Sequence, residues 1–371
     1  MSRLRIAVIG AGHLGKFHAR LLAGMELVEL VAVADPISAA RESLAAECRT
    51  QPVADFRDLI GRIDAAVIAA PTRLHHEVAM PLLAAGVHLL VEKPITPTVA
   101  EANELVALAK MQGVVLQVGH IERFNPALAE TLPHIREPKY LEAARHTPYT
   151  FRSTDVGVVL DLMIHDLDIV LSLVQSPLRS VAALGVAVIG PHEDVAQARL
   201  TFENGAVANL SASRVSFQPQ RKLQVWTRNG FAAVDFAERK GTIVTPSEML
   251  KAGEFQGDQL SPVQKTHYKD HLFEELLPLR KYELQNRNAM LDELTDFVES
   301  VQTGRAPRVT GEQGRDALAA AEMVMQSIAN HAWDGRSDGR IGPHAEPPHP
   351  ILRGPHWVQT APLPAEHREA G

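Results

Sequence analysis

The fold is decided by residues 4–15, which read LRIAVIGAGHLG. A short apolar strand over residues 5–9 runs directly into three glycines that open a helix. Gly10 permits a tight turn, Gly12 lets the backbone approach a pyrophosphate, and Gly15 lets the helix lie close to the sheet. The unpaired N–H groups at the start of that helix offer hydrogen bonds to an anion. This arrangement predicts a site for a dinucleotide.

An acidic residue, Asp35, ends the second predicted strand, 20 residues after Gly15. Its carboxylate can accept hydrogen bonds from the adenosine ribose hydroxyls, and it would repel a 2′-phosphate. We therefore expect NAD as the cofactor, with NADP less favoured. Arg41, a little further along the chain, argues mildly in the other direction.

Short apolar strands alternate with amphipathic helical stretches over residues 4–118, as in a parallel sheet that is covered on both faces. We predict an α/β fold class, with a doubly wound Rossmann domain over residues 1–123. The predicted strands are residues 5–9, 27–34, 64–70, 87–91 and 114–118. The predicted helices are residues 13–23, 38–46, 75–85 and 98–110.

The pattern changes after about Phe124, where prolines interrupt the chain and short strands follow one another without intervening helices. Asn-Gly pairs mark two of the turns between them, as in hairpins. We predict an α+β domain with a mostly antiparallel open sheet over residues 124–333, and a flexible tail over residues 334–371. The predicted strands are residues 180–189, 195–202, 206–214, 221–227 and 231–235, and helices over residues 290–302 and 313–331 close the domain.

Charge and composition exclude several classes of protein. The 37 Lys and Arg residues against 44 Asp and Glu residues leave a net charge of −7, so no basic field gathers nucleic acid or anionic lipid. No apolar run is long enough for a membrane-spanning helix, and the single cysteine, Cys48, forms no internal disulfide. We expect a cytoplasmic protein without nucleic-acid or membrane partners. We assign no metal site, since the histidines of the tail lack a fixed geometry.

Three polar clusters follow predicted strands, at the edge where doubly wound sheets bind ligands. They are Ala70-Pro71-Thr72 with His75, Glu92-Lys93-Pro94, and Gly119-His120 with Arg123-Phe124-Asn125. Pro94 restricts Lys93 to extended geometry and fixes its direction, as a positioned catalytic amine requires. Taken alone, Glu92 and Lys93 also fit a solvated strand end, and His75 also fits an ordinary helix start.

An apolar helical stretch, residues 157–168, is interrupted by Asp161, His165 and Asp168 at spacings of four and three. On a helix these side chains share one face, which indicates either a buried structural network or a proton-transfer site. Beside a dinucleotide domain the second interpretation is favoured, because hydride removal from an alcohol requires a partner for the hydroxyl proton.

Together these motifs, in their order and spacing over about residues 3–331, resemble the Gfo/Idh/MocA family, named for glucose-fructose oxidoreductase and inositol dehydrogenase. The resemblance implies an NAD(P)-dependent sugar or cyclitol dehydrogenase with Lys93, Asp161 and His165 as its catalytic group. We assign cofactor contacts to Gly10, Gly12, His13, Leu14, Gly15, Asp35, Ala70, Pro71, Thr72, His75, Glu92 and Lys93. We assign substrate contacts to Lys93, His120, Arg123, Asn125, Asp161 and His165.

Residues 118–126 (VGHIERFNP) and 158–168 (VVLDLMIHDLD) further resemble a bacterial subgroup that includes UDP-N-acetylglucosamine 3-dehydrogenases. This resemblance implies a nucleotide-sugar substrate such as UDP-N-acetylglucosamine. Arg123, Arg145 and Arg152 could contact its diphosphate, but they fit surface residues equally well. Two alternatives stay open. One is a dehydrogenase of a free sugar or inositol, and the other is a catalytically silent NAD-binding regulatory protein.

The expected mechanism places the substrate hydroxyl between Lys93 and His165. His165 takes the proton, Lys93 stabilises the negative charge on the oxygen, and Asp161 orients the imidazole ring. If burial depresses the pKa of Lys93, the roles of Lys93 and His165 could be exchanged.

The predicted antiparallel sheet also suggests how subunits associate. Leu200, Phe202 and Val207 alternate with polar residues in a way that leaves some apolar surface on the sheet. Apolar surface of this kind marks an interface, and the family resemblance points the same way. We therefore expect a homodimer or homotetramer.

Overall fold

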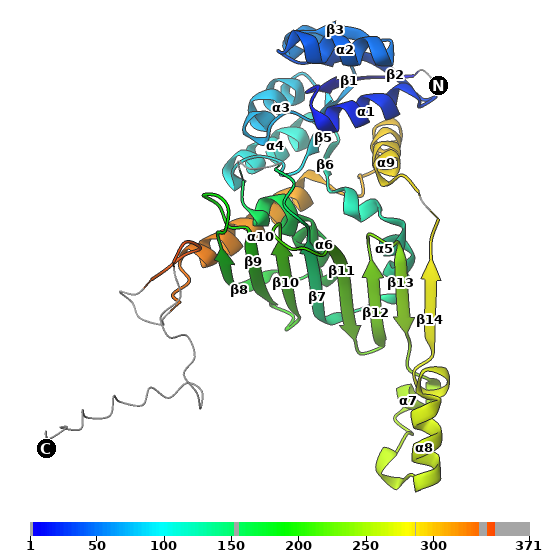
Figure 1. Cartoon of the computed structure of the whole chain (residues 1–371). Coiled ribbons are helices and arrows are strands. Elements are labelled where there is room, and N and C mark those ends of the chain that lie inside the picture. The colour runs from blue at the N-terminus through cyan, green and yellow to red at the C-terminus, as the bar shows by residue number, and fades with distance from the viewer. Residues whose placement is uncertain (1–2, 152–155, 286, 334–339, 346–371) are drawn as a thin grey trace, which may run out of the picture.

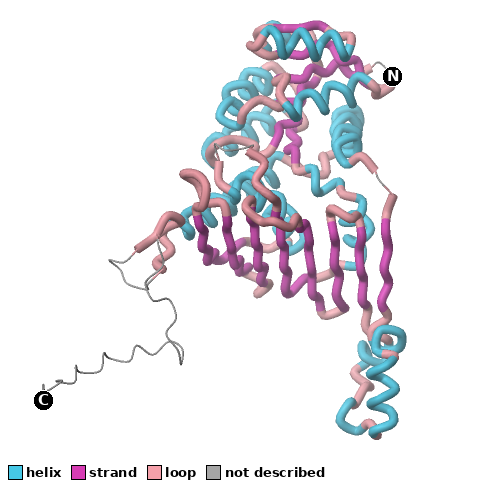
Figure 2. The backbone as a smooth tube through the Cα atoms, viewed as in Figure 1, coloured by secondary structure: helices cyan, strands magenta, loops and turns pink. Residues whose placement is uncertain are grey.

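Two sheets and the helices between them form the core of the protein in a computed structural model (Figure 1). The structure describes residues 3–151, 156–285, 287–333 and 340–345. Figure 2 shows the smaller sheet with helices on both of its faces, and the larger sheet with helices on the face toward the smaller one. Within these described ranges, no helix is both long and apolar enough to cross a membrane.

The first sheet has six strands in the order β3-β2-β1-β4-β5-β6, and all neighbouring strands are parallel. This order confirms the predicted doubly wound Rossmann fold. The sequence did not predict β3, because its three residues are too few to show a periodic pattern. The strands are β1 (Leu4–Ile9), β2 (Val28–Ala34), β3 (Gln51–Val53), β4 (Ala65–Ile68), β5 (His88–Glu92) and β6 (Leu116–Gly119).

Four helices follow strands of this sheet at the positions that the sequence predicts. They are α1 (His13–Ala23), α2 (Ser38–Cys48), α3 (His75–Ala84) and α4 (Val99–Gln112). The bounds of α4 have a clear local cause. Thr98 and Glu101 form a capping box at its start, and Gly113 ends it with a positive φ of 66°.

The second sheet has eight strands in the order β14-β13-β12-β11-β7-β10-β9-β8, and only β7 and β10 pair in parallel. The predicted mostly antiparallel sheet is therefore confirmed. The proline pattern hid β7, because Pro138 begins this strand, where a missing N–H is tolerated. The strands are β7 (Pro138–His146), β8 (Leu178–Val186), β9 (Val195–Phe202), β10 (Val207–Ser213), β11 (Gln220–Thr227), β12 (Gly230–Asp235), β13 (Lys240–Val244) and β14 (Leu279–Glu283).

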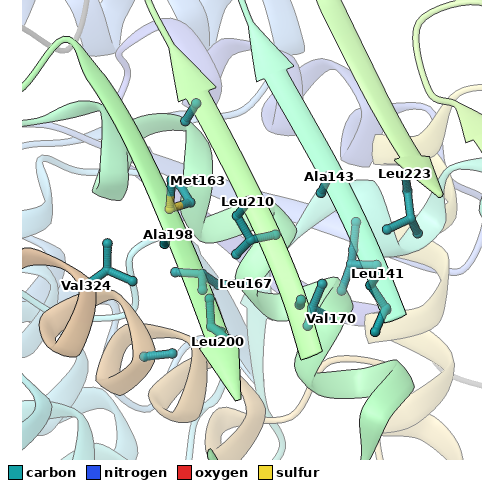
Figure 3. Packing of buried hydrophobic residues seen from close by; sticks show 14 of the residues in the cluster. Leu141, Ala143, Met163, Leu167, Val170, Ala198, Leu200, Leu210, Leu223 and Val324 are labelled. Atoms are coloured by element: carbon teal, nitrogen blue, oxygen red, sulfur yellow. The ribbon is translucent and has the colours of Figure 1, made fainter. Parts of the chain in front are cut away.

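One face of the second sheet is covered by α6 (Ile164–Val174) and α10 (Gly311–Ala329). In Figure 3, Leu200 and Leu210 from the sheet lie against Leu167 and Val324 from these helices. Leu200 and Phe202 are fully buried, so the expectation that they leave exposed apolar surface is wrong. The apolar half of each strand faces the helices, and the uncovered face carries polar residues such as Glu142, Gln197, Asn209 and Gln224.

The helix α9 (Ala289–Thr303) lies on the first sheet, although the sequence predicted that it closes the second domain. Its Leu294 and Phe297 are fully buried in the same apolar cluster as Ile6 and Leu90 of β1 and β5. That prediction is wrong because periodicity identifies the apolar face of a helix but not the surface it packs against. The helix α10 contacts both sheets.

Three shorter helices complete the second half of the chain: α5 (Pro126–Thr131), α7 (Glu248–Ala252) and α8 (Pro262–Asp270). The helices α7 and α8 form an arm between β13 and β14 that projects beyond the edge of the sheet (Figure 1).

Part of the predicted tail, residues 340–345, lies within the described residues and is hydrogen-bonded to the second domain. Gly342 N donates to His331 O, and Ala187 N donates to Pro343 O. The other tail residues, 334–339 and 346–371, lie outside the described residues.

Candidate active site

The turn after β1 has the shape that a pyrophosphate requires. Gly10 has a φ of +102°, and a Cβ there would lie 2.6 Å from Ala69 O. A Cβ at Gly15 would lie 1.8 Å from Gly10 O, whereas a Cβ at Gly12 would meet nothing within 4 Å. Two glycines are therefore required by the packing of the turn, and the third leaves open space beside the backbone. His13 begins α1 at this point, so the described residues fit a dinucleotide.

Asp35, directly after β2, lies against the same turn. Its Oδ2 accepts a hydrogen bond of 2.7 Å from Ala11 N, and its Oδ1 accepts one of 2.8 Å from Ile37 N. A carboxylate has about four lone-pair sites, so these two bonds leave capacity for ribose hydroxyls. Arg41 donates to the backbone carbonyls of Asp35 and Pro36, so its guanidinium lies next to the backbone of Asp35.

Glu92 ends β5 with its carboxylate turned toward α1. Its Oε1 lies 2.7 Å from Nε2 of His18, and its Oε2 accepts a bond from Lys93 N. Burial raises the pKa of Glu92, but the hydrogen bond and charge of His18, with the charge of Lys93, outweigh it and hold the pKa below its ordinary value. The sequence analysis missed His18; its position beside Ala19 on the buried face of α1 was the available signal.

His75 ties two of the predicted clusters together. Its Nδ1 lies 2.9 Å from Pro94 O and its Nε2 lies 2.8 Å from Ala70 O. Burial lowers the pKa of His75, so the ring is neutral at pH 7. Both carbonyls can only accept, so the single N–H of the ring hydrogen-bonds one of them and the other is a close contact without a hydrogen bond. The side chain fixes the loop of Ala70, Pro71 and Thr72 relative to the one after β5, which makes His75 a positioning residue.

Lys93 reaches from the first domain to the second. The Lys93–Pro94 peptide bond is cis, and the Nζ of Lys93 donates to the backbone oxygen of Asp161 at 2.6 Å. The Nζ also lies 3.6 Å from Asp161 Oδ1. Burial lowers the pKa of Lys93, while the charges of Asp161 and Glu92 oppose that shift. The structure thus brings two of the three predicted catalytic residues together.

His165 lies at the start of α6, directly after a π-helical turn over Val159–Met163. Its Nδ1 is buried without a hydrogen-bond partner among the described residues. Burial holds its pKa well below the ordinary value of 6.5, and the positive charges of Lys93 and Arg145 add to this effect. The imidazole of His165 is therefore neutral at pH 7.

The expectation that Asp161 orients the ring of His165 is wrong. Asp161 faces Lys93 instead, and within the described part of the chain Nδ1 of His165 has no hydrogen-bond partner. The spacing of four aligns two side chains only on a regular α-helix. A π turn holds more residues per turn, so the turn at Val159–Met163 displaces Asp161 from the face that His165 occupies.

His120 lies next to His165. The two rings meet edge to face with their centroids 6.0 Å apart. Both ring nitrogens of His120 are buried without a partner among the described residues, and burial lowers its pKa. Buried unpaired nitrogens are costly, so His120 is a group to which a ligand can supply the missing hydrogen bond.

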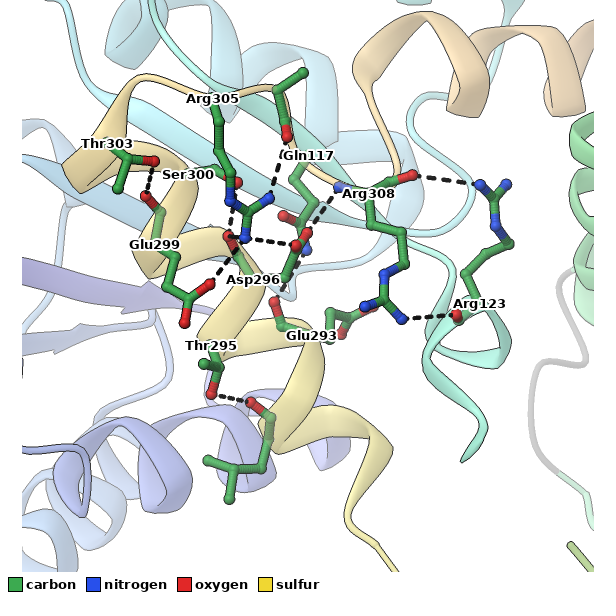
Figure 4. A network of polar contacts seen from close by, with 12 residues as sticks. Gln117, Arg123, Glu293, Thr295, Asp296, Glu299, Ser300, Thr303, Arg305 and Arg308 are labelled. Atoms are coloured by element: carbon green, nitrogen blue, oxygen red, sulfur yellow. Dashed lines mark hydrogen bonds and ion pairs between the residues drawn. The ribbon is translucent and has the colours of Figure 1, made fainter. Parts of the chain in front are cut away.

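Arg123 and Asn125, both predicted to contact substrate, have partners within the protein. Arg123 pairs with Asp168 at 3.2 Å and donates to the backbone of Arg308, and Figure 4 shows Arg308 returning a bond to Arg123 O. Asn125 caps α5 and donates to Phe236 O. Asp168 is therefore engaged with Arg123 and does not join Asp161 and His165.

Arg145 is enclosed in an ion-pair network that the sequence analysis did not foresee. Its guanidinium lies 2.6 Å from Glu122 and 2.8 Å from Asp166, and its side chain is 3% exposed. The expectation that Arg145 contacts a diphosphate is therefore wrong, because both of its hydrogen-bonding edges are occupied by carboxylates. Arg152 lies outside the described residues.

The family comparisons agree with this site and fold. A model of an oxidoreductase family with an NAD-binding Rossmann fold, named for Gfo, Idh and MocA, matches residues 4–120. The model of the C-terminal alpha/beta domain of the same family matches residues 144–333. The two models leave few described residues unmatched, and the first identifies the N-terminal domain as NAD-binding.

Individual relatives are similar over most of the chain. The UDP-N-acetylglucosamine 3-dehydrogenase of Acidithiobacillus ferrooxidans is 36% identical over 333 residues, covering 88% of this chain and 98% of the relative. Its solved structure superposes with a TM-score of 0.77 at 34% identity and covers 88% and 98% of the two chains. The scyllo-inositol dehydrogenase of Lactobacillus casei, solved with NAD(H) and scyllo-inositol, shares the fold, with a TM-score of 0.70 at 19% identity over 88% and 97%.

Replacing Asp35 with Ala should raise the apparent KM for NAD and narrow the preference for NAD over NADP. The change deletes acceptors for the ribose hydroxyls, each worth about 1.5–3 kcal/mol when charged, and it removes the repulsion toward a 2′-phosphate. Steady-state kinetics with both cofactors measures the effect. Asp58→Ala, at an exposed position of the same domain, is the control, and unchanged discrimination in Asp35→Ala would exclude Asp35 from the adenosine site.

Proposed function

Because the chain belongs to the Gfo/Idh/MocA oxidoreductase family, we propose that it transfers hydride between the 3-hydroxyl carbon of UDP-N-acetylglucosamine and NAD. The observation that carries the proposal is the contact of Lys93 with the segment of Asp161 and His165 at the edge of the dinucleotide domain. The relative with 36% identity, which is named for this substrate, supports the choice of nucleotide sugar. NADP is the less favoured cofactor because of Asp35.

The cofactor would be held by the glycine turn, Asp35 and the loop of Ala70, Pro71 and Thr72, and when bound it supplies the acceptor for the hydride. The residues of the chain handle the proton. Lys93, whose Nζ is 2.6 Å from Asp161 O, donates a hydrogen bond to the substrate oxygen and stabilises its developing negative charge.

The neutral imidazole of His165 takes the hydroxyl proton as general base. Since Nδ1 is buried, the accepting atom is Nε2. The imidazolium formed would lie near Lys93 and Arg145, whose charges disfavour it, so the proton passes on readily to solvent. His120 contributes hydrogen bonds to the sugar from its unpaired nitrogens.

The role of Asp161 follows from its contact with Lys93. Its carboxylate lies 3.6 Å from the Nζ and favours the charged ammonium, which burial disfavours. Asp161 therefore acts on the reaction through the charge and position of Lys93. The sequence-based assignment of Asp161 to the orientation of His165 is replaced by this one.

A substrate panel tests the proposed function. The protein is incubated with NAD and, separately, UDP-N-acetylglucosamine, other UDP-sugars, free aldoses and inositols, and NADH formation is followed by absorbance. UDP-N-acetylglucosamine should give the highest kcat/KM. Higher kcat/KM with inositol or a free sugar would replace the proposal with that alternative, and tight NAD binding without turnover of any sugar would indicate a regulatory protein.

Replacing Lys93 or His165 with Ala should lower kcat by about 100-fold or more, the scale expected for one positioned donor or base. Asp161→Asn should cost less, because it weakens the hold on Lys93 without removing a reacting group. NAD affinity should change little in all three variants. Measuring kcat, NAD binding and thermal unfolding on the same proteins separates catalysis from stability, and a stable His165→Ala protein with wild-type turnover would contradict the mechanism.

The pH profile of kcat/KM distinguishes the two assignments of base. With His165 as base, activity falls as the pH drops through its pKa, which burial and nearby cations hold well below 6.5. Activity also falls at alkaline pH as the Lys93 ammonium, with a pKa lowered from 10.5, loses its proton. A plateau across neutral pH is therefore expected. Activity that instead rises throughout the alkaline range would make Lys93 the base.

We also propose that the protein forms a homodimer or homotetramer through the uncovered face of the second sheet. The ring of Trp226 contacts those of Tyr140 and Phe231 there, with ring centroids 5.1 and 5.0 Å apart, and all three residues are partly exposed. Aromatic residues within a polar surface are typical of interfaces. Light scattering at micromolar concentration should give at least twice the chain mass, and a mass near 40.5 kDa would exclude association.

A further inference from the structure

The arm between β13 and β14 carries a cluster of possible metal ligands that the proposed function does not use. Its members are His267 near the end of α8, His271 at its C-cap, and Glu275 in the π-helical turn Leu272–Leu276 that follows. One ligand atom from each of the three residues lies within 4.8 Å of the other two. The sequence-based predictions concern only the histidines of the tail and do not include this group.

His267 and Glu275 can approach each other because the helix α8 ends between them. Residues eight apart on a continuous α-helix are separated by about 12 Å along its axis, too far for His267 and Glu275 to share one ion. The helix ends at His271, which has φ −111° and ψ 23°, and the chain turns there. As a result Nε2 of His267 lies 2.9 Å from Oε1 of Glu275.

The chain also orients the middle ligand. Nδ1 of His271 lies 2.9 Å from the backbone oxygen of His267. A carbonyl can only accept, so Nδ1 carries the hydrogen and Nε2 of the neutral ring carries the lone pair. Metal-bound histidines have this same support from a carbonyl or carboxylate on the second nitrogen. The rings of His267 and His271 are stacked, with centroids 4.5 Å apart, which keeps a ligand atom of each within reach of the other and of Glu275.

We propose that His267, His271 and Glu275 bind one divalent transition-metal ion with the ligand preferences of Zn²⁺. Two imidazole nitrogens and one carboxylate oxygen form a set that zinc accepts, whereas calcium and magnesium prefer oxygen ligands alone. Three protein ligands leave a fourth position for water. Figure 1 shows the arm at the end of the second sheet away from the dinucleotide domain, so the ion holds the turn between α8 and β14 and takes no part in the chemistry at Lys93.

Zinc binding to the full chain, measured by titration calorimetry on metal-free protein without an affinity tag, tests the proposal. One site should weaken at least about tenfold in His271→Ala and in Glu275→Gln, because loss of even an indirect contact to a metal costs that much. Glu274→Gln and His134→Ala remove an exposed neighbouring carboxylate and an exposed histidine outside the cluster, and they should leave binding unchanged. The tail histidines are present in every variant, so they cancel in the comparison.

Two further measurements test the same site independently of calorimetry. Bound Co²⁺ should give a visible absorption spectrum in the wild type and in Glu274→Gln, and it should lose that spectrum in His271→Ala. Zinc should also raise the Tm of the wild type more than that of Glu275→Gln, since a ligand stabilises the state that binds it. Equal zinc affinity in wild type, His271→Ala and Glu275→Gln would overturn the proposal and leave His267 and Glu275 as a surface ion pair.

Discussion

The contact between the Nζ of Lys93 and the backbone oxygen of Asp161 joins the two domains at the candidate active site. The lysine comes from the end of a parallel strand and the carbonyl from the turn that begins α6, so neither domain can form this contact alone. The Lys93 side chain is only 17% exposed, and burial makes its charge costly. The nearby carboxylates of Asp161 and Glu92 offset that cost and keep the amine at one position.

The charge of Lys93 in turn contributes to the state of its neighbours. His165 lies near this ammonium and the guanidinium of Arg145, and both charges disfavour a protonated ring. Arg145 is itself fixed by Asp166 and Glu122. Removing one partner from a buried pair of this kind costs roughly 3–5 kcal/mol, so the network holds α6 against β7. Burial is the main cause of the neutral imidazole, and the charge of Arg145, which these ion pairs hold in place, adds to it.

The features that the sequence predicts well are those that depend on residues close together in the chain. The glycine turn, the parallel strands and the four helices of the first domain follow from spacing and caps within a few residues of each element. The features it missed depend on residues far apart in the chain. Asp168 pairs with Arg123 across 45 positions, and His18 pairs with Glu92 across 74, and no periodicity encodes such distances. The error at Asp161 has a different cause, because the rule of i and i+4 holds only where the helix is regular.

The packing of α9 against the first sheet is a long-range contact that supports the position of the active-site residues. Gln117 of β6 donates to the backbone of Glu293 on α9, and the loop after α9 exchanges hydrogen bonds with Arg123 (Figure 4). Burial holds the pKa of Glu293 well above its ordinary value, and the charge of Glu92 adds to the shift. Burial and the charge of Glu92 both favour the protonated form of Glu293, and in that form α9 packs against the first sheet without placing a second negative charge beside Glu92. The carboxylate of Glu92 can then interact with His18 and Lys93, so the packing of a helix from the second half of the chain supports the position of the catalytic lysine.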